Sequence, residues 1–164
     1  MTAPDLVTAA EEAVKAQVSV ALVEQPYRVA GRKSAAPAPQ LDAAWIAVVE
    51  QLDVEGPLFV GGRSSGARVA CRTAAATNAA GVLCLAFPLH PPGRPDKTRL
   101  PELEAVTVPV LIVQGESDPF GMPPEAPGRT VVRLRGNHGL KSDAPGLRAA
   151  VREFLARGND SDVD

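Results

Sequence analysis

Residues 57–70 have the sequence Pro57-Leu58-Phe59-Val60-Gly61-Gly62-Arg63-Ser64-Ser65-Gly66-Ala67-Arg68-Val69-Ala70. The centre of this stretch fits the pattern Gly-x-Ser-x-Gly, between an apolar run that predicts a strand and an alanine-rich segment that predicts a helix. A sharp strand-to-helix turn strains the central serine, and glycines two residues away on either side leave room for the neighbouring backbone. We therefore predict that Ser64 is a nucleophile. The alternative is an ordinary glycine-rich turn or a phosphate loop, although no P-loop lysine follows.

On both sides of this turn, short apolar runs alternate with helical patterns, which is typical of a parallel sheet with helices on both faces. Strands are expected at residues 18–23, 58–60, 82–87, 108–113 and 131–134. Helices are expected at 4–16, 39–53, from the serine turn to about residue 80, and at 144–157. The first helix should bury Leu6, Ala10 and Val14 on one face. The sequence thus predicts one α/β domain over residues 1–157 and a disordered acidic tail over 158–164.

Two later loops offer an acid and a base. Asp118 follows the strand at 108–113, and His138 follows the strand at 131–134. Because the carboxyl ends of parallel strands meet at one edge of a sheet, Ser64, Asp118 and His138 are expected to converge there, in the chain order nucleophile, acid, histidine. The alternatives are that Asp118 only caps a turn or that Glu116 is the acid, whereas Asp143 is expected to cap the final helix.

Composition narrows the possible partners and cofactors. The formal net charge is -2 and no basic stripe is present, so nucleic acid and anionic membranes are not expected to bind. No apolar run is long enough to span a bilayer and the first residues do not fit a signal peptide, which favours a location in the cytoplasm.

The spacing of Cys71 and Cys84 fits no metal site, so both cysteines are expected to be structural. We expect neither a metal nor a cofactor.

Five motifs carry a resemblance to a known family: Glu24-Gln25-Pro26-Tyr27-Arg28, Gly61-Gly62-Arg63-Ser64-Ser65-Gly66, Ala86-Phe87-Pro88-Leu89-His90-Pro91-Pro92-Gly93, Gln114-Gly115-Glu116-Ser117-Asp118-Pro119-Phe120-Gly121 and Gly136-Asn137-His138. The chain resembles the small, lidless α/β-hydrolases related to dienelactone hydrolases, especially a bacterial group similar to the hydrolase-like domain of a eukaryotic chromatin-complex subunit. The resemblance covers about residues 3–155. It implies a serine hydrolase with Ser64, Asp118 and His138 as the catalytic triad, and it implies no particular substrate.

The same resemblance implies that the chain lacks the first three strands of the α/β-hydrolase fold. Residues 1–16 match the helix that follows the third strand, whose glycine-rich loop supplies one oxyanion donor. In the family that strand lies between the strands matched here by residues 18–23 and 58–60. We expect that Met1 is an internal start and that the natural protein has residues upstream, which its mass would test. The alternative is a chain that takes a strand from a partner, as in a homodimer.

The predicted triad suits acyl transfer from a small carboxylic ester or related acyl compound to water. The backbone N–H of Ser65 is the expected oxyanion donor. Arg63 and His90 are candidate substrate-binding residues, the first for an anionic substrate and the second in the pocket wall. For Arg63 the alternative is a solvated surface charge. The alternative functions are a catalytically weak or inactive interaction module that keeps the hydrolase framework, and an acyltransferase.

Overall fold

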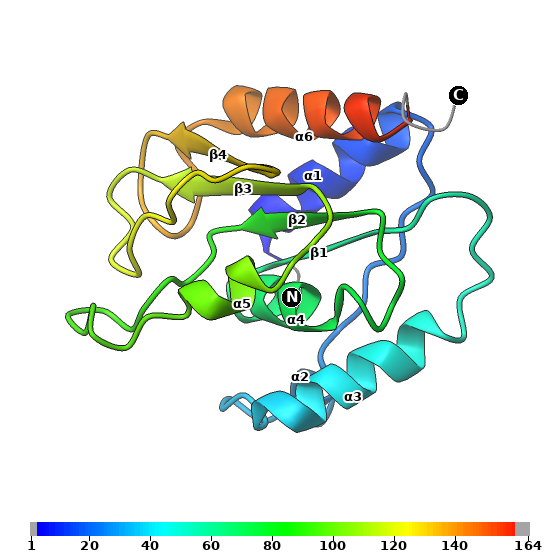
Figure 1. The fold of residues 1–164 in the computed structure, drawn as a ribbon, viewed down its shortest axis with the longest axis horizontal. Helices are drawn as coiled ribbons and strands as arrows, with labels where there is room; N and C mark the ends of the chain where they lie inside the picture. The colour runs from blue at the N-terminus through cyan, green and yellow to red at the C-terminus, as the bar shows by residue number, and fades with distance from the viewer. Residues whose placement is uncertain (1–2, 160–164) are drawn as a thin grey trace.

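The computed structural model describes residues 3–159, in which a four-stranded sheet lies between two layers of helices (Figure 1). The elements in chain order are α1 (Pro4–Lys15), α2 (Pro26–Val29), α3 (Ala38–Val49), β1 (Phe59–Arg63), α4 (Ser65–Thr73), β2 (Gly81–Leu85), α5 (Leu100–Glu104), β3 (Val110–Gly115), β4 (Arg129–Leu134) and α6 (Ala144–Asn159). All strands are parallel, in the spatial order β1-β2-β3-β4. The predicted α/β architecture is confirmed, with helices on both faces of the sheet.

The register of the sheet aligns the ends of its strands. Gly62 of β1 lies opposite Cys84 of β2, which lies opposite Ile112 of β3, and Ile112 lies opposite Val131 of β4. Because all four strands run in the same direction, the loops that leave β1, β3 and β4 emerge at one edge. This edge is where the sequence predicts the functional residues.

The two faces of the sheet are covered by different helices (Figure 1). On one face α6 packs on β3 and β4 and is itself contacted by α1. On the other face α4 packs on β1 and β2, with α3 and α5 against it. Small buried side chains on α4, such as Ala67, Ala70 and Cys71, let this helix approach the sheet closely. The strands that lead into the loops at this edge are therefore packed between helices on both faces of the sheet.

The strand predicted at residues 18–23 is wrong. This segment connects α1 to α2 without joining the sheet, and within residues 3–159 β1 pairs only with β2. Val20 and Leu22 are exposed by 38% and 52%. The apolar run has the composition of a strand, but a strand also needs a neighbour that accepts its backbone hydrogen bonds.

The helices also differ from the predictions in their ends and faces. α3 ends at Val49 instead of residue 53. α4 ends at Thr73 instead of about residue 80, and turns follow as far as Asn78, whose left-handed conformation with φ 52° precedes β2. The buried face of α1 holds Asp5, Ala9 and Glu12. Of the predicted apolar face, Leu6 packs partly buried against the core, whereas Val14 is 60% exposed, so the prediction is wrong for Val14. The cause is a set of ion pairs that bury the two carboxylates.

The C-terminal helix continues beyond its predicted end. α6 includes residues 158 and 159, where the sequence predicts the start of a disordered tail, and residues 160–164 of that predicted tail lie outside the described part of the chain. Over residues 3–159, no helix has the length and apolar character that crossing a membrane requires.

Candidate active site

Ser64 lies in the turn between β1 and α4, in a backbone conformation that is rare for a residue with a side chain. Its φ is 53° and its ψ is -112°, and its N–H donates to the carbonyl oxygen of Leu85 at 2.9 Å. A Cβ on Gly62 would lie 2.5 Å from the carbonyl carbon of Gly66, so the first glycine of the motif is required by close backbone packing. A Cβ on Gly66 would meet nothing within 4 Å, so the expectation that both glycines relieve crowding holds only for the first.

Asp118 lies in the loop after β3, with its side chain only 1% exposed. Its Oδ1 accepts a hydrogen bond from the N–H of Phe120 at 2.9 Å, and its Oδ2 accepts one from Nε2 of Gln114 at 3.0 Å. The loop is closed further by the N–H of Gly121, which donates to the main-chain oxygen of Asp118. The carboxylate is thus fixed in one orientation by groups of its own strand and loop.

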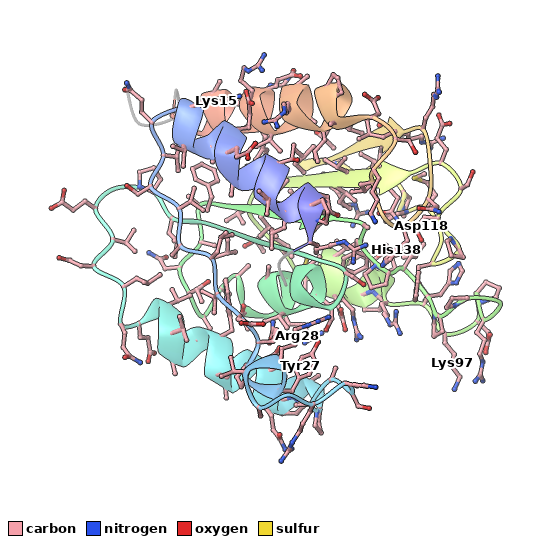
Figure 2. All side chains as sticks on the ribbon, turned by 180° about the vertical axis from the view of Figure 1, so that it is seen from behind. Lys15, Tyr27, Arg28, Lys97, Asp118 and His138 are labelled. Atoms are coloured by element: carbon pink, nitrogen blue, oxygen red, sulfur yellow. The ribbon has the colours of Figure 1, made fainter. Side chains whose placement is uncertain are left out.

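His138 lies in the loop after β4 and contacts both of the other residues. Its Nδ1 is 2.8 Å from Oδ2 of Asp118, and its Nε2 is 2.9 Å from Oγ of Ser64. A carboxylate only accepts hydrogen bonds, so Nδ1 carries the proton and Nε2 is left to accept the proton of the hydroxyl. Figure 2 shows Asp118 and His138 side by side at one end of the molecule. The ring of Phe120 lies 4.4 Å from the imidazole, between centroids.

The three side chains therefore form a continuous hydrogen-bonded chain from hydroxyl to imidazole to carboxylate. They come from the loops after β1, β3 and β4, which emerge at the edge formed by the carboxyl ends of the strands. Chemically, this arrangement lets the imidazole remove the hydroxyl proton while the carboxylate stabilises the resulting cation. The structure thus brings together all three residues that the sequence singled out.

The predicted neighbours of this chain occupy different positions. Ser65 is the first residue of α4, where a main-chain N–H has no acceptor within its own helix. The main-chain N–H of His90 donates to the carbonyl oxygen of Phe120 at 3.0 Å, so His90 lies beside the Asp118 loop. The guanidinium of Arg63 is bonded to Asp5 and to the main-chain oxygen of His138. Substrate binding by Arg63 and His90 stays a prediction.

The two other acidic residues considered in the sequence lie away from the hydrogen-bonded chain. Glu116 is exposed on the loop after β3. The Oδ1 of Asp143 accepts a hydrogen bond from the N–H of Gly146 at 2.9 Å, so the prediction that Asp143 caps the final helix is confirmed.

Sequence reasoning missed two residues that fix the site. Gln114 is fully buried at the end of β3, and its Nε2 also lies within hydrogen-bonding distance of the main-chain oxygens of Phe87 and Gly121. Phe120 places its ring against the imidazole of His138. The available signal was a glutamine near the end of an otherwise apolar strand, because a buried amide requires hydrogen-bonding partners.

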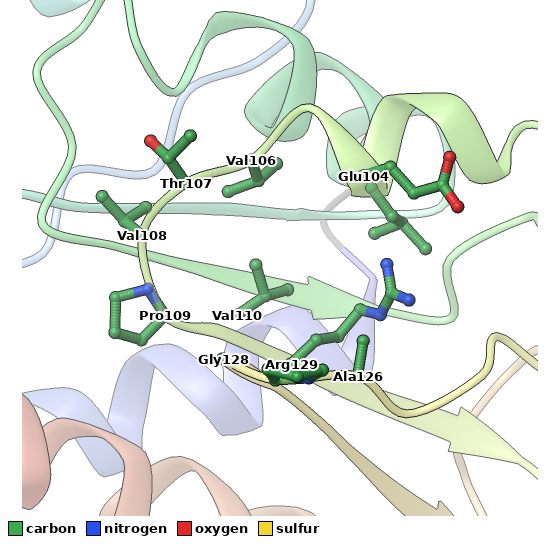
Figure 3. A pocket seen from close by; sticks show the side chains of 11 residues that line it. Glu104, Val106, Thr107, Val108, Pro109, Val110, Ala126, Gly128 and Arg129 are labelled. Carbon is green, nitrogen blue, oxygen red and sulfur yellow. The ribbon is translucent and has the colours of Figure 1, made fainter.

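A hollow of about 420 Å³ lies away from this site (Figure 3). It is lined by residues at the amino ends of β3 and β4, including Pro109, Val110, Gly128 and Arg129, together with Glu104 at the end of α5. Since Ser64, Asp118 and His138 follow the carboxyl ends of their strands, the hollow is at the opposite edge of the sheet. Its position separates it from the hydrogen-bonded chain.

Neither cysteines nor metal ligands contribute to the site in the described part of the chain. Cys71 and Cys84 are buried, with their sulfur atoms 3.5 Å apart. The hydrogen bond with Cys71, together with burial, raises the pKa of the Cys84 thiol well above its ordinary value. Within residues 3–159, no group of three or more His, Cys, Asp and Glu side chains could hold a metal ion.

Comparisons with known proteins agree with this architecture. The model of a family described as "Alpha/beta hydrolase domain" matches residues 1–141. A protein of the alpha/beta hydrolase superfamily from Xanthomonas campestris pv. campestris superposes with a TM-score of 0.70 at 15% identity, over 93% of this chain and 90% of its own. A lidless alpha/beta serine hydrolase from Xanthomonas campestris gives a TM-score of 0.67 at 21% identity, over 93% of this chain and 72% of its own.

A third structure, from a study of the metagenome-derived lipolytic enzymes LipS and LipT, gives a TM-score of 0.67 at 16% identity. The superposition covers 95% of this chain and 88% of the chain in that structure. At these identities the superpositions show the fold, and they confirm the predicted fold class. The narrower resemblance to dienelactone hydrolases and to the chromatin-complex subunit stays a prediction.

Proposed function

Because the chain belongs to the alpha/beta hydrolase domain family, we propose that it is a serine hydrolase that cleaves carboxylic esters or related acyl compounds. The observation that carries the proposal is the 2.9 Å approach of Nε2 of His138 to Oγ of Ser64, continued at 2.8 Å from Nδ1 to Asp118. Hydrogen bonds from a hydroxyl to an imidazole and on to a carboxylate turn a serine hydroxyl, which is a weak nucleophile at neutral pH, into an effective one.

In the first half of the proposed reaction, Oγ of Ser64 attacks the carbonyl carbon while Nε2 of His138 takes the hydroxyl proton. The carbonyl π electrons move to oxygen, and the main-chain N–H of Ser65 donates a hydrogen bond to this oxyanion. The N-terminus of α4 lies at the same place and its dipole favours negative charge. Asp118 stabilises the imidazolium that forms. The tetrahedral intermediate then collapses, and His138 gives its proton to the leaving alcohol.

The second half repeats these steps with water. His138 takes a proton from water as the water oxygen attacks the acyl carbon, and it returns the proton to Oγ of Ser64 when the carboxylic acid leaves. The strained backbone of Ser64, with φ 53°, supports this role because it holds Oγ out on the turn, within reach of the imidazole.

The substrates we propose are small acyl compounds that approach from solvent. The side chain of His138 is 19% exposed, so the imidazole is reachable while most of it is desolvated. One structural neighbour is described as a serine hydrolase without a lid, and the same open access suits this chain. His90 and Phe120 lie beside the Asp118 loop and are the residues we propose to line the acyl-binding wall.

Hydrolysis of p-nitrophenyl acetate and p-nitrophenyl butyrate tests the proposal. We expect Ser64→Ala and His138→Gln each to lower kcat/KM by about 10³-fold or more, with thermal stability near that of the parent. Ser117→Ala, which removes an exposed hydroxyl from the Asp118 loop, is the matched control and should keep the parent rate.

Two results would count against the proposal. If Ser64→Ala hydrolysed these esters as fast as the parent protein, another group would be the nucleophile. If the folded parent protein showed no hydrolysis above buffer for any acyl ester tried, the framework would serve as a non-catalytic interaction module.

A further inference from the structure

The side chain of Arg63 joins three parts of the molecule that are far apart in the sequence. Arg63 is the last residue of β1 and directly precedes Ser64. Its Nε donates to Oδ2 of Asp5 in α1 at 2.8 Å, and its Nη2 donates to the main-chain oxygen of His138 at 2.8 Å. One guanidinium therefore connects the start of α1, the serine turn and the histidine loop.

The anchor of this connection is a fixed carboxylate. The side chain of Asp5 is fully buried, and its Oδ1 also accepts a hydrogen bond from the N–H of Leu6 at 2.9 Å. Asp5 lies in the first turn of α1, where the helix dipole favours a negative charge. A buried carboxylate needs a cationic or hydrogen-bonding partner, and Arg63 supplies both. The guanidinium is thus held at one end before it reaches the histidine loop.

We infer that Arg63 is a positioning residue for the proposed hydrolase reaction. By holding the main-chain oxygen of His138, it fixes the backbone that carries the imidazole and keeps Nε2 within reach of Oγ of Ser64. The guanidinium of Arg63 bonds to Asp5 and to the main chain of His138, both within the protein. Its effect on the reaction is therefore exerted through the position of His138. The inference rests on the proposed function.

The histidine loop has a backbone that benefits from such a restraint. Leu140, two residues after His138, has φ of 48°, a conformation that a leucine rarely adopts, and Gly136, two residues before His138, has φ of 110°, which only glycine adopts readily. Asp118 and Phe120 hold the imidazole ring, whereas Arg63 holds the main chain behind it. A lysine has one compact donor group and lacks the planar fork that reaches both acceptors at once.

The test compares Arg63→Lys and Arg63→Gln with the parent protein. We expect kcat for p-nitrophenyl acetate to fall by about 10- to 100-fold in both variants, since displacement of a catalytic group by about 1 Å costs on this order. KM should change by less than about 3-fold, because no contact with substrate is removed. Asp5→Asn, which weakens the anchor and leaves the contact with His138, should lower kcat by a smaller factor.

Arg68→Gln is the matched control. The side chain of Arg68 is 26% exposed, as is that of Arg63, and it forms two hydrogen bonds with Glu102 on α5, away from the histidine loop. We expect Arg68→Gln to keep kcat and to lower the melting temperature by less than Arg63→Gln does, because Glu102 is more exposed than Asp5 and keeps its ion pair with Arg72. Equal losses of kcat in both variants, or an unchanged kcat in folded Arg63→Gln, would overturn the inference.

A second measurement keeps the two proposals separable. The proton on Nδ1 of His138, bonded to Asp118, should give a downfield NMR resonance in the parent protein. His90→Gln identifies that resonance, because the chain has two histidines. We expect Arg63→Gln to shift or broaden it, and an unchanged resonance would overturn the positioning role. If the parent protein hydrolyses no ester, the proposed function fails while this resonance still reports on positioning.

Discussion

Gly115→Ala should disable the site although none of the three side chains of Ser64, Asp118 and His138 is replaced. Gly115 is the last residue of β3, and a Cβ there would lie 2.4 Å from the carbonyl oxygen of Asn137 and 2.7 Å from that of Gly136. Both atoms belong to the backbone that leads into His138. No flexible side chain can move aside to relieve these contacts, so the loop itself must shift.

The size of the shift follows from ordinary contact distances. Contacts of a Cβ with neighbouring atoms normally begin at 3.4 Å, so the Asn137 carbonyl must retreat by about 1 Å. His138 is the next residue, and its Nε2 now lies 2.9 Å from Oγ of Ser64. A displacement of this size in a catalytic group costs about 10²-fold in rate. Crowding of this kind also costs about 1–3 kcal/mol of stability, which in a chain of this length lowers Tm by about 2–4 °C per kcal/mol.

The assay is kcat/KM for p-nitrophenyl acetate, measured beside thermal unfolding of the same samples. Ile112→Val is the control, because it lies on the same strand, is fully buried and should cost about 0.5–1.5 kcal/mol without moving the histidine loop. We expect the control to lose stability and keep its activity. The steric reasoning would be refuted if folded Gly115→Ala kept the parent rate.

Three further predictions concern packing and charge. Cys84 should resist alkylation by iodoacetamide in the native protein, because burial and its hydrogen-bonded neighbour raise its pKa, and rapid modification of folded protein would contradict this. Gly62→Ala should lower the melting temperature, whereas Gly66→Ala should not, and equal losses would show that the crowding is misjudged. A hydrogen bond from Arg152 lowers the pKa of Glu12 below its ordinary value of 4.5, so the stability that Glu12 contributes is present above that pH and is lost as pH falls through the lowered pKa. Glu12→Gln should therefore be less stable than the parent at pH 7 by urea unfolding, with a difference that shrinks in acid; a constant difference would contradict the linkage.

The parts of the fold that could be predicted from sequence are those whose signal is local. The strand found at Val110–Gly115 is buried along its whole length, and its composition indicates it. The strand found at Arg129–Leu134 is only partly buried, but the short apolar run within it, which includes the buried Val131 and Leu134, indicates its position. The parallel direction of the strands then requires their carboxyl ends to meet, which brings the loops of Ser64, Asp118 and His138 together. Chain order and topology were sufficient for this part of the site.

The parts that could not be predicted depend on contacts between distant residues. The run at residues 18–23 looks like a strand, but no local feature shows whether a neighbour pairs with it. Asp5 and Glu12 lie on the buried face of α1 because Arg63 and Arg152 meet them there, and helical periodicity treats both as surface residues. For the same reason sequence alone offers Arg63 only as a substrate-binding candidate or a solvated surface charge, and it gives no sign of the partners of Arg63 within the protein.

The central claim is that the imidazole of His138 activates the hydroxyl of Ser64. Reaction with a fluorophosphonate probe, followed by mass spectrometry of the labelled peptide, measures this most directly, because only an activated serine reacts at an appreciable rate. We predict one label per chain, located on Ser64, and loss of that label in folded His138→Gln. An unlabelled Ser64 in the folded parent protein, or a rate of labelling that His138→Gln leaves unchanged, would contradict it.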